Sequence, residues 1–150
     1  MDTSTGWTDF LGPVKIVALA PAAAGHYAQW TPLAPSNLEA VAEMLNDGDA
    51  SVNQSGTAGQ IDTFAMADLT ALSGTVFAVQ HVLVARQDAG AQRVIAPVQR
   101  SGSTDYVGSS KNLSTSYQML TEIHEVNPAT SSAFTIADVN DLEAGYTLIA

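Results

Sequence analysis

Three histidines are the residues best suited to bind a metal, and they are widely separated in the chain. His26, His81 and His124 fall into no known ligand spacing. Structural zinc sites and related centres draw their ligands from short, regularly spaced motifs. We therefore expect no metal centre. His81 belongs to an apolar stretch, so we expect it to be a core or interface residue whose hydrogen-bonding groups are satisfied.

Paired carboxylates are the next candidates for chemistry. Glu122 and Glu125 are three residues apart, and on a strand that spacing places them on opposite faces, where they could not flank one glycosidic bond. Asp47 and Asp49 resemble part of a calcium loop, but the glycine and the closing glutamate of an EF-hand are missing, so a solvated turn is expected.

Nucleophile and phosphate-binding motifs are not evident either. The sequence has neither a Gly-x-Ser-x-Gly elbow nor a Ser-x-x-Lys motif, and the GTAG of residues 56–59 is too short for a phosphate loop. No acid, base, nucleophile and metal ligand converge, and no cofactor motif is present. The sequence therefore predicts that the protein is not an enzyme and uses no cofactor.

The aromatic residues leave two hypotheses open. Trp7, Trp30, Tyr27 and Tyr106 could stack on sugar rings in a lectin-like surface. Aromatic residues make up only 7% of the chain, however, so Trp30 and the nearby Tyr27 are better explained as anchors in a core or an interface.

Composition limits the class of protein. The 150 residues are enough for one domain with a sizeable core, and the lack of cysteine excludes disulfides and thiolate chemistry. A formal charge of −10 makes nucleic acid a poor partner. Only 13% of residues are charged and 46% are hydrophobic, which suits a surface partly covered by other proteins. No apolar run approaches the ~20 residues of a membrane span, and no signal peptide is evident, so a soluble protein made in the cytoplasm is expected.

The spacing of turn-forming residues predicts an all-β fold. Glycine, proline, asparagine and aspartate interrupt the chain at intervals too short for most helices, which favours an antiparallel β-sandwich or a barrel. The predicted strands cover residues 14–20, 60–67, 75–86, 92–101, 116–126 and 144–150. Residues 92–101 are predicted to pair with residues 75–86, with Pro97 at an edge or bulge.

Two of these strands have informative faces. Residues 75–86 are apolar on both faces, so one face is predicted to be covered by the core and the other by the core or by a partner chain. In residues 116–126 the alternation predicts Tyr117, Met119, Thr121 and Ile123 inward, with Glu122 and His124 among the outward residues.

Helix is predicted in few places. Thr135 is expected to cap a short helix near the C-terminus together with Asp138. Residues 37–45 have helical spacing and could equally form an extended arm. Residues 1–14 are predicted to be a flexible N-terminal arm, followed by a single domain over residues 15–150.

Several segments resemble a family of small structural proteins of tailed bacteriophages. They are AVQHVLVARQDAG (residues 78–90), RSGSTDY (100–106), STSY (114–117) and NPATSSAFTIADVNDLEAG (127–145). The run from Ala20 to Trp30 is similar to the family's opening. The chain departs from the family pattern at Asn127, where an aspartate is usual, and at Phe134, where a tryptophan is usual.

The resemblance implies a jelly-roll or concanavalin-like sandwich on the surface of a virion. It leaves open whether such a protein decorates the capsid or forms a spike or part of the tail. The missing cysteines and the lack of a catalytic cluster favour a capsid decoration protein that binds the major capsid protein, without contact to nucleic acid or membrane. A homotrimer is expected because sites between hexamers of an icosahedral shell have threefold or quasi-threefold symmetry. A receptor- or glycan-binding module of a head fibre or tail is the alternative. The residues expected to bind partners are Trp7, Phe10, Leu11, Tyr27 and Trp30, the first three as an apolar hook on the arm.

Overall fold

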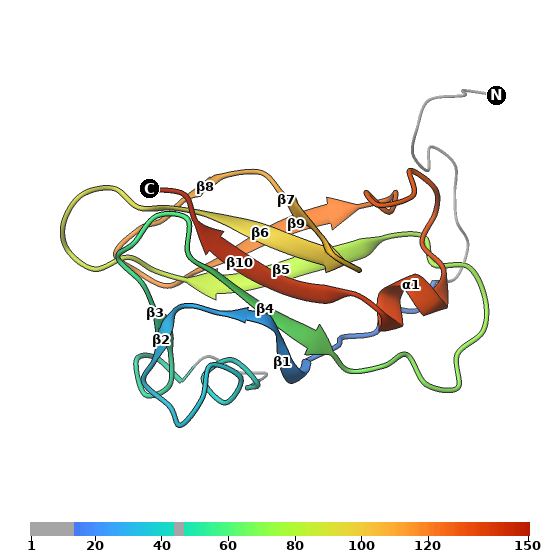
Figure 1. The fold of residues 1–150 in the computed structure, drawn as a ribbon, viewed down its shortest axis with the longest axis horizontal. Helices are drawn as coiled ribbons and strands as arrows, with labels where there is room; N and C mark the ends of the chain where they lie inside the picture. The colour runs from blue at the N-terminus through green and yellow to red at the C-terminus, as the bar shows by residue number, and fades with distance from the viewer. Residues whose placement is uncertain (1–13, 44–46) are drawn as a thin grey trace.

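The computed structural model describes residues 14–43 and 47–150, and its regular secondary structure consists almost entirely of antiparallel strands (Figure 1). In chain order the elements are β1 (Pro21–Ala28), β2 (Thr31–Pro32), β3 (Asn53–Gln54), β4 (Ile61–Met66), β5 (Val79–Ala85), β6 (Val94–Ser101), β7 (Thr104–Val107), β8 (Lys111–Asn112), β9 (Gln118–His124), α1 (Ile136–Asn140) and β10 (Glu143–Leu148). The predicted all-β, antiparallel class with one short helix near the C-terminus is confirmed. Trp7, Phe10 and Leu11 of the predicted arm lie outside the described residues.

The larger sheet has the strand order β1-β4-β10-β6-β7, and β8 also pairs with β6. Strand β6 is central, because β10 lies along one side and β7 and β8 share the other. Its sequence VIAPVQRS is apolar at successive positions, and Ile95, Ala96 and Val98 are almost completely buried. Such a run suits a strand that is covered on both faces.

Pro97 occupies a gap in the ladder on one side of the central strand β6, so of its two predicted places, an edge or a bulge, the edge is wrong. On one side of β6 it faces Tyr146 of β10. On the other side, pairing with β8 ends at Ile95 and pairing with β7 begins at Val98. The Pro97 carbonyl accepts a hydrogen bond from Gly108 N on this interrupted side. The backbone N and C=O of one strand residue point to the same side of the strand. The N–H that Pro97 lacks would therefore point to the interrupted side of β6, where no neighbouring strand needs a donor.

The larger sheet is strongly curved. Strands β1 and β7 are at opposite ends of the strand order, and in a flat sheet they would lie about 19 Å apart. The Tyr27 hydroxyl of β1 nevertheless donates to Asp105 Oδ2 of β7 over 2.9 Å. Two register shifts in the pairing of β1 with β4 accompany this bend, as expected for irregular strand pairing.

A second sheet of two strands, β5 and β9, packs against one face of the larger sheet. Leu83 of β5 and Leu120 of β9 contact a core that includes Phe64, Ile95 and Tyr146. Strand β5 pairs with β9 over its whole length and does not pair with β6, so the predicted hairpin between residues 75–86 and 92–101 was wrong. The connection crosses between the layers instead.

The crossing after β5 is stabilised by Gln87, a buried residue. Its Oε1 accepts from Arg93 N at 2.9 Å and from Gln92 Nε2 at 3.0 Å, and its backbone N–H donates to Ser114 O at 2.8 Å. These bonds connect the start of β6 to the chain that leaves β5. The residues between the two strands therefore pass from the β5–β9 sheet to the larger sheet.

The remaining local predictions had mixed outcomes. The strands expected at residues 60–67 and 144–150 are β4 and β10. Residues 14–20 form no strand. Residues 36–42 form hydrogen-bonded turns, with Ala40 N–H bonded to Ser36 O and Ala42 N–H to Leu38 O. Of the two alternatives for residues 37–45, these bonds favour one or two helical turns over an extended arm in the part of the segment that is described.

The predicted helix cap is confirmed. Thr135 Oγ1 accepts from Asp138 N at 3.1 Å, and Asp138 Oδ2 accepts from Thr135 N at 2.7 Å. This reciprocal pair satisfies two free N–H groups at the start of α1. The backbone N–H of Thr135 and its hydroxyl, which also donates to Asp138 Oδ2, hold the pKa of the Asp138 carboxyl below its usual value.

Candidate functional site

The sheet formed by β5 and β9 presents an apolar face to solvent, which we call the outer face of β5–β9. It consists of Gln80, Val82 and Val84 on β5 and Met119, Thr121 and Ile123 on β9. The four large apolar side chains are exposed by 48% (Val82), 50% (Val84), 69% (Met119) and 62% (Ile123). Alternation in the two strands brings them to the same side, since Val84 lies opposite Met119 and Gln80 opposite Ile123.

The inward and outward residues of β9 are therefore the reverse of those predicted. Met119 and Ile123 face solvent, and the other alternating set, Leu120 and Glu122, faces the larger sheet. Leu120 is the one large aliphatic residue in that inward set, and it packs on the core. For residues 75–86, the prediction of two apolar faces holds within β5, and nothing among the described residues covers its outer face.

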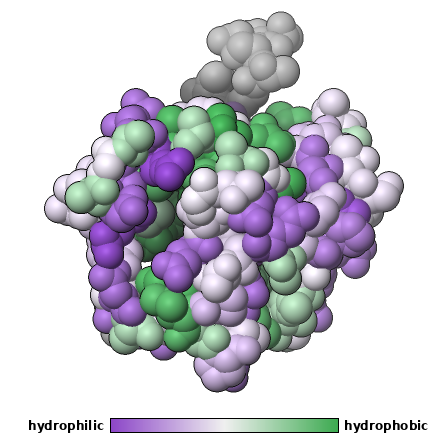
Figure 2. Space-filling view, turned by 60° about the vertical axis from the view of Figure 1, so that its left-hand side comes forward, coloured by the Kyte–Doolittle hydropathy of each residue, from purple (hydrophilic) through white to green (hydrophobic). Residues whose placement is uncertain are grey.

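The outer face of β5–β9 carries no charged side chain, although the chain has a formal charge of −10. On the side of the molecule that Figure 2 presents, apolar side chains lie in several patches separated by polar residues. An uncharged group of large apolar side chains on a regular, rigid sheet is typical of a surface that contacts another protein.

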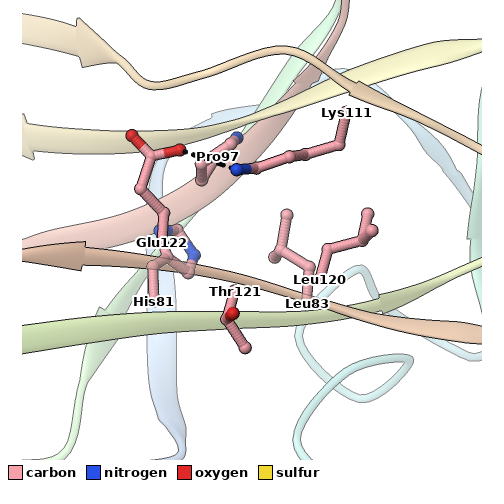
Figure 3. Close-up of a pocket in the computed structure, with 7 residues that line it drawn as sticks. All are labelled: His81, Leu83, Pro97, Lys111, Leu120, Thr121 and Glu122. Atoms are coloured by element: carbon pink, nitrogen blue, oxygen red, sulfur yellow. Dashed lines mark ion pairs between the residues drawn. The ribbon is translucent and has the colours of Figure 1, made fainter.

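Polar groups lie between the two sheets beneath this face (Figure 3). Both carboxylate oxygens of Glu122 accept from Ser109 N, at 2.8 and 3.0 Å. Lys111 Nζ lies 3.6 Å from Glu122 Oε2, and His124 Nε2 lies 3.8 Å from Oε1. The gap that His81, Lys111 and Glu122 line is too narrow to hold a water molecule, so it offers no space for a substrate.

His81 is 8% exposed, and its Nδ1 has no hydrogen-bond partner. Burial, reinforced by the nearby His124, lowers its pKa to about 4 against the opposing influence of Glu122. The side chain is therefore neutral at pH 7. Its position in the interior agrees with the prediction, whereas the expected satisfaction of its hydrogen-bonding groups was wrong.

An open groove lies beside the outer face. It has a volume of about 530 Å³ and runs between β7 with its following turn and the end of β9. Its polar and aromatic lining includes Asp105, Tyr106, Glu122 and His124. Tyr106, one of the aromatic residues considered for sugar stacking, is thus placed in a concave surface.

Tyr27 and Trp30, two of the predicted partner-binding residues, are half-buried and make internal contacts. Tyr27 donates to Asp105 and lies beneath the Arg100 guanidinium, 5.3 Å from its ring centre; the hydrogen bond to Asp105 raises the pKa of Tyr27. Trp30 packs edge-on against Tyr146 and donates from Nε1 to Gln60 O at 3.1 Å. Both belong to the framework, and their role in binding stays a prediction.

The acidic turn at Asp47 and Asp49 is closed by local partners. Asp49 Oδ2 lies 2.7 Å from an Arg86 guanidinium nitrogen, and Asp49 Oδ1 accepts from the Tyr117 hydroxyl at 2.6 Å. The Arg86 hydrogen bond lowers the pKa of Asp49. Across the described residues, no group of three or more histidine, aspartate and glutamate side chains is arranged to hold a metal ion.

Comparison with known proteins gave no relative. No family model matches the sequence, and neither the curated proteins nor the solved structures include a significant match. No helix in the described part of the chain has the length and apolar character needed to cross a membrane.

Proposed function

We propose that this protein is a capsid decoration (cement) protein of a tailed bacteriophage, located on the virion surface. It binds the outer surface of the major capsid protein shell and stabilises it. The outer face of β5–β9 is the observation that carries the proposal, and the resemblance of several segments to phage structural proteins supports it. The finer fold, a jelly-roll or concanavalin-like sandwich, belongs to the same proposal.

The size of the face explains why such a protein would act as an oligomer. Burying the exposed parts of Val82, Val84, Met119 and Ile123 contributes on the order of 1 kcal/mol per side chain. The sum of about 4 kcal/mol corresponds to a dissociation constant near 1 mM, which is too weak for stable attachment by one copy. A homotrimer that presents three such faces at a threefold or quasi-threefold site gains the missing affinity through avidity.

Binding to assembled shells tests the proposal. Purified protein is mixed with shells of the major capsid protein that lack it, and bound copies are counted after sedimentation. The double variant Met119→Lys/Ile123→Lys places two charges in the face and is expected to lose at least about tenfold in affinity. The control is Leu33→Lys, which places a charge on an apolar residue that is also more than half exposed, in the loop after β2. Full occupancy by the double variant would show that this face does not attach the protein.

A second experiment separates this face from the predicted N-terminal hook. Removing residues 1–10 deletes Trp7 and Phe10 and leaves every described residue in place. If the hook attaches the protein, the truncated form remains folded and leaves the shell. If the outer face alone attaches it, the truncated form binds as the full chain does.

The groove favours one alternative function, a glycan-binding module of a head fibre or tail. Its volume falls in the range of ligand sites, about 300–1,000 Å³. Tyr106 and the carboxylate of Asp105 offer an aromatic surface and hydrogen-bond acceptors of the kind that sugars require. Saturable binding of host polysaccharide that Tyr106→Ala abolishes and Met119→Lys/Ile123→Lys leaves intact would favour this alternative.

A further inference from the structure

Residues 14–19, VKIVAL, are an exposed apolar segment with the composition of a strand. Ile16 is 92% exposed and Val14 is 53% exposed, and residues 14–18 are all classed as exposed. No hydrogen bond connects residues 14–19 to any other described residue. Branched apolar residues at this density normally occur in paired, buried strands. The described fold leaves this segment without a partner.

Strand β5 has a free edge that lacks the usual protection against pairing. Its backbone pairs with β9 along one edge, and no hydrogen bond joins the other edge to a described residue. Natural edge strands avoid pairing with other chains by short length, proline, lysine or inward-pointing charges. The seven residues VQHVLVA contain none of these devices. The edge therefore has the features of a template for one more strand.

Strand β9 is the more closely contacted strand of the pair, because its inward side chains meet residues 109–112. Gln118 Nε2 donates to Asn112 O at 2.7 Å, and Glu122 accepts from Ser109 N and lies near Lys111. Among the described residues, β5 therefore provides the more open edge of the pair.

We propose that residues 14–19 of one copy pair as an added strand with the free edge of β5 in a second copy. The inference deepens the proposed self-association and rests on it. Lengths agree, because six extended residues span about 20 Å and the seven residues of β5 span about 23 Å. Charges agree as well: residues 14–19 contain only Lys15 as a charged residue and β5 contains none, so two chains of formal charge −10 meet where neither carries a carboxylate.

Strand donation also completes the smaller sheet. An isolated pair of strands is marginal in water, and although β5–β9 also packs on the larger sheet, a third strand would add paired backbone and apolar contact to it. The donated segment would widen the apolar outer face of β5–β9 and satisfy backbone groups on both chains. The contact is heterologous, since donor and acceptor are different parts of the chain. Such contacts close into rings when the rotation between copies allows it, as a homotrimer requires.

Proline substitution in the donor tests the proposal on the free protein, without shells. The full chain is expected to be oligomeric by size-exclusion chromatography with light scattering. Ile16→Pro removes an N–H and blocks a ladder, so association is expected to weaken by about 100-fold or more. Circular dichroism and the melting temperature of the monomer should be unchanged, because Ile16 contacts so little. Ile16→Val, which keeps the N–H and the branched side chain, is the matched control and is expected to remain oligomeric.

Mixing two complementary variants tests whether residues 14–19 are the segment that pairs with the free edge of β5. Val82→Lys/Val84→Lys damages the acceptor and keeps the donor, while Ile16→Pro damages the donor and keeps the acceptor. Each variant alone is expected to be monomeric, and an equimolar mixture is expected to form heterodimers, with one intact donor and one intact acceptor.

Three results would overturn strand donation: a monomeric full chain, an Ile16→Pro variant that associates like the wild type, or variants that fail to complement each other. The last result would indicate symmetric pairing of β5 with β5, or packing of the outer faces. Shell binding is measured separately, so a failure of strand donation is distinguishable from a failure of the decoration function.

Discussion

Asn37 Nδ2 donates to the buried carboxylate of Asp62 over 2.7 Å, which joins the chain after β2 to the start of β4. Asp62 is fully buried, and its oxygens also accept from Gln29 N at 2.6 Å and Trp30 N at 2.9 Å. The Tyr146 hydroxyl donates to Asp62 Oδ2 over 3.3 Å. Burial and the neighbouring Asp62 charge raise the pKa of Tyr146 far above its usual range. A buried carboxylate is tolerated only with such partners, so this group orders the chain around Trp30.

Replacing Asp62 by alanine is expected to lower the free energy of unfolding by about 3 kcal/mol or more, because several buried donors lose their acceptor together. Urea denaturation followed by circular dichroism measures the change. Asp68→Ala is the control, since Asp68 is exposed and should alter stability by less than about 0.5 kcal/mol. Similar midpoints for the two variants would show that the Asp62 contacts do not hold this part of the fold.

The buried His81 predicts a loss of stability in mild acid. Because its pKa is about 4 when folded and 6.5 when unfolded, the unfolded chain binds more protons between these values. The free energy of unfolding therefore falls as the pH decreases through this window, by about 2 kcal/mol between pH 7 and pH 5. Urea denaturation at each pH measures the slope.

His81→Leu removes the titrating group and is expected to flatten this part of the pH profile. His26→Asn, which replaces an exposed histidine, should keep the wild-type slope. If the slope of His81→Leu equals that of the wild type, groups other than His81 cause the acid sensitivity.

Local sequence signals predicted much of the strand content because they depend on neighbouring residues. The cap at Thr135 and Asp138 needs only a spacing of three, and β4 and β10 follow from short apolar runs between turns. Pairing partners are different. The turn at Asp88 and Gly90 suggested a hairpin, yet the chain crosses between layers there, and no local signal records which strand a distant segment will meet.

The faces of β9 show a second limit of the sequence. Alternation indicates that Met119 and Ile123 share one side and that Leu120 and Glu122 share the other, but it does not say which side is buried. Taking the more apolar side as inward gave the wrong answer, because the interior accepts Glu122 through the Ser109 N–H group. The β9 half of the candidate site was missed for the same reason, since Met119, Thr121 and Ile123 were assigned to the core. For residues 75–86 the apolar pattern leaves a partner chain as one of two possible covers.

The cap of α1 is expected to contribute measurably to stability although the helix has only five residues. Thr135→Ala removes the hydroxyl that accepts from Asp138 N, and it should lower the free energy of unfolding by about 1 kcal/mol. Thr135→Ser keeps the acceptor and should retain most of the wild-type value. Equal losses in the two variants would assign the effect to the threonine methyl group instead of the cap.

The orientation of β9 can be tested by substituting neighbouring residues. Leu120→Ala removes a side chain that packs on the core and is expected to cost about 2 kcal/mol or more in the free energy of unfolding. Met119→Ala truncates a side chain that is 69% exposed and should change it by less than about 0.5 kcal/mol. Urea denaturation of the monomeric Ile16→Pro background measures both changes without a contribution from association. The opposite order, with Met119→Ala the more destabilising, would mean that β9 faces inward as its sequence first suggested and that the outer face described above does not exist.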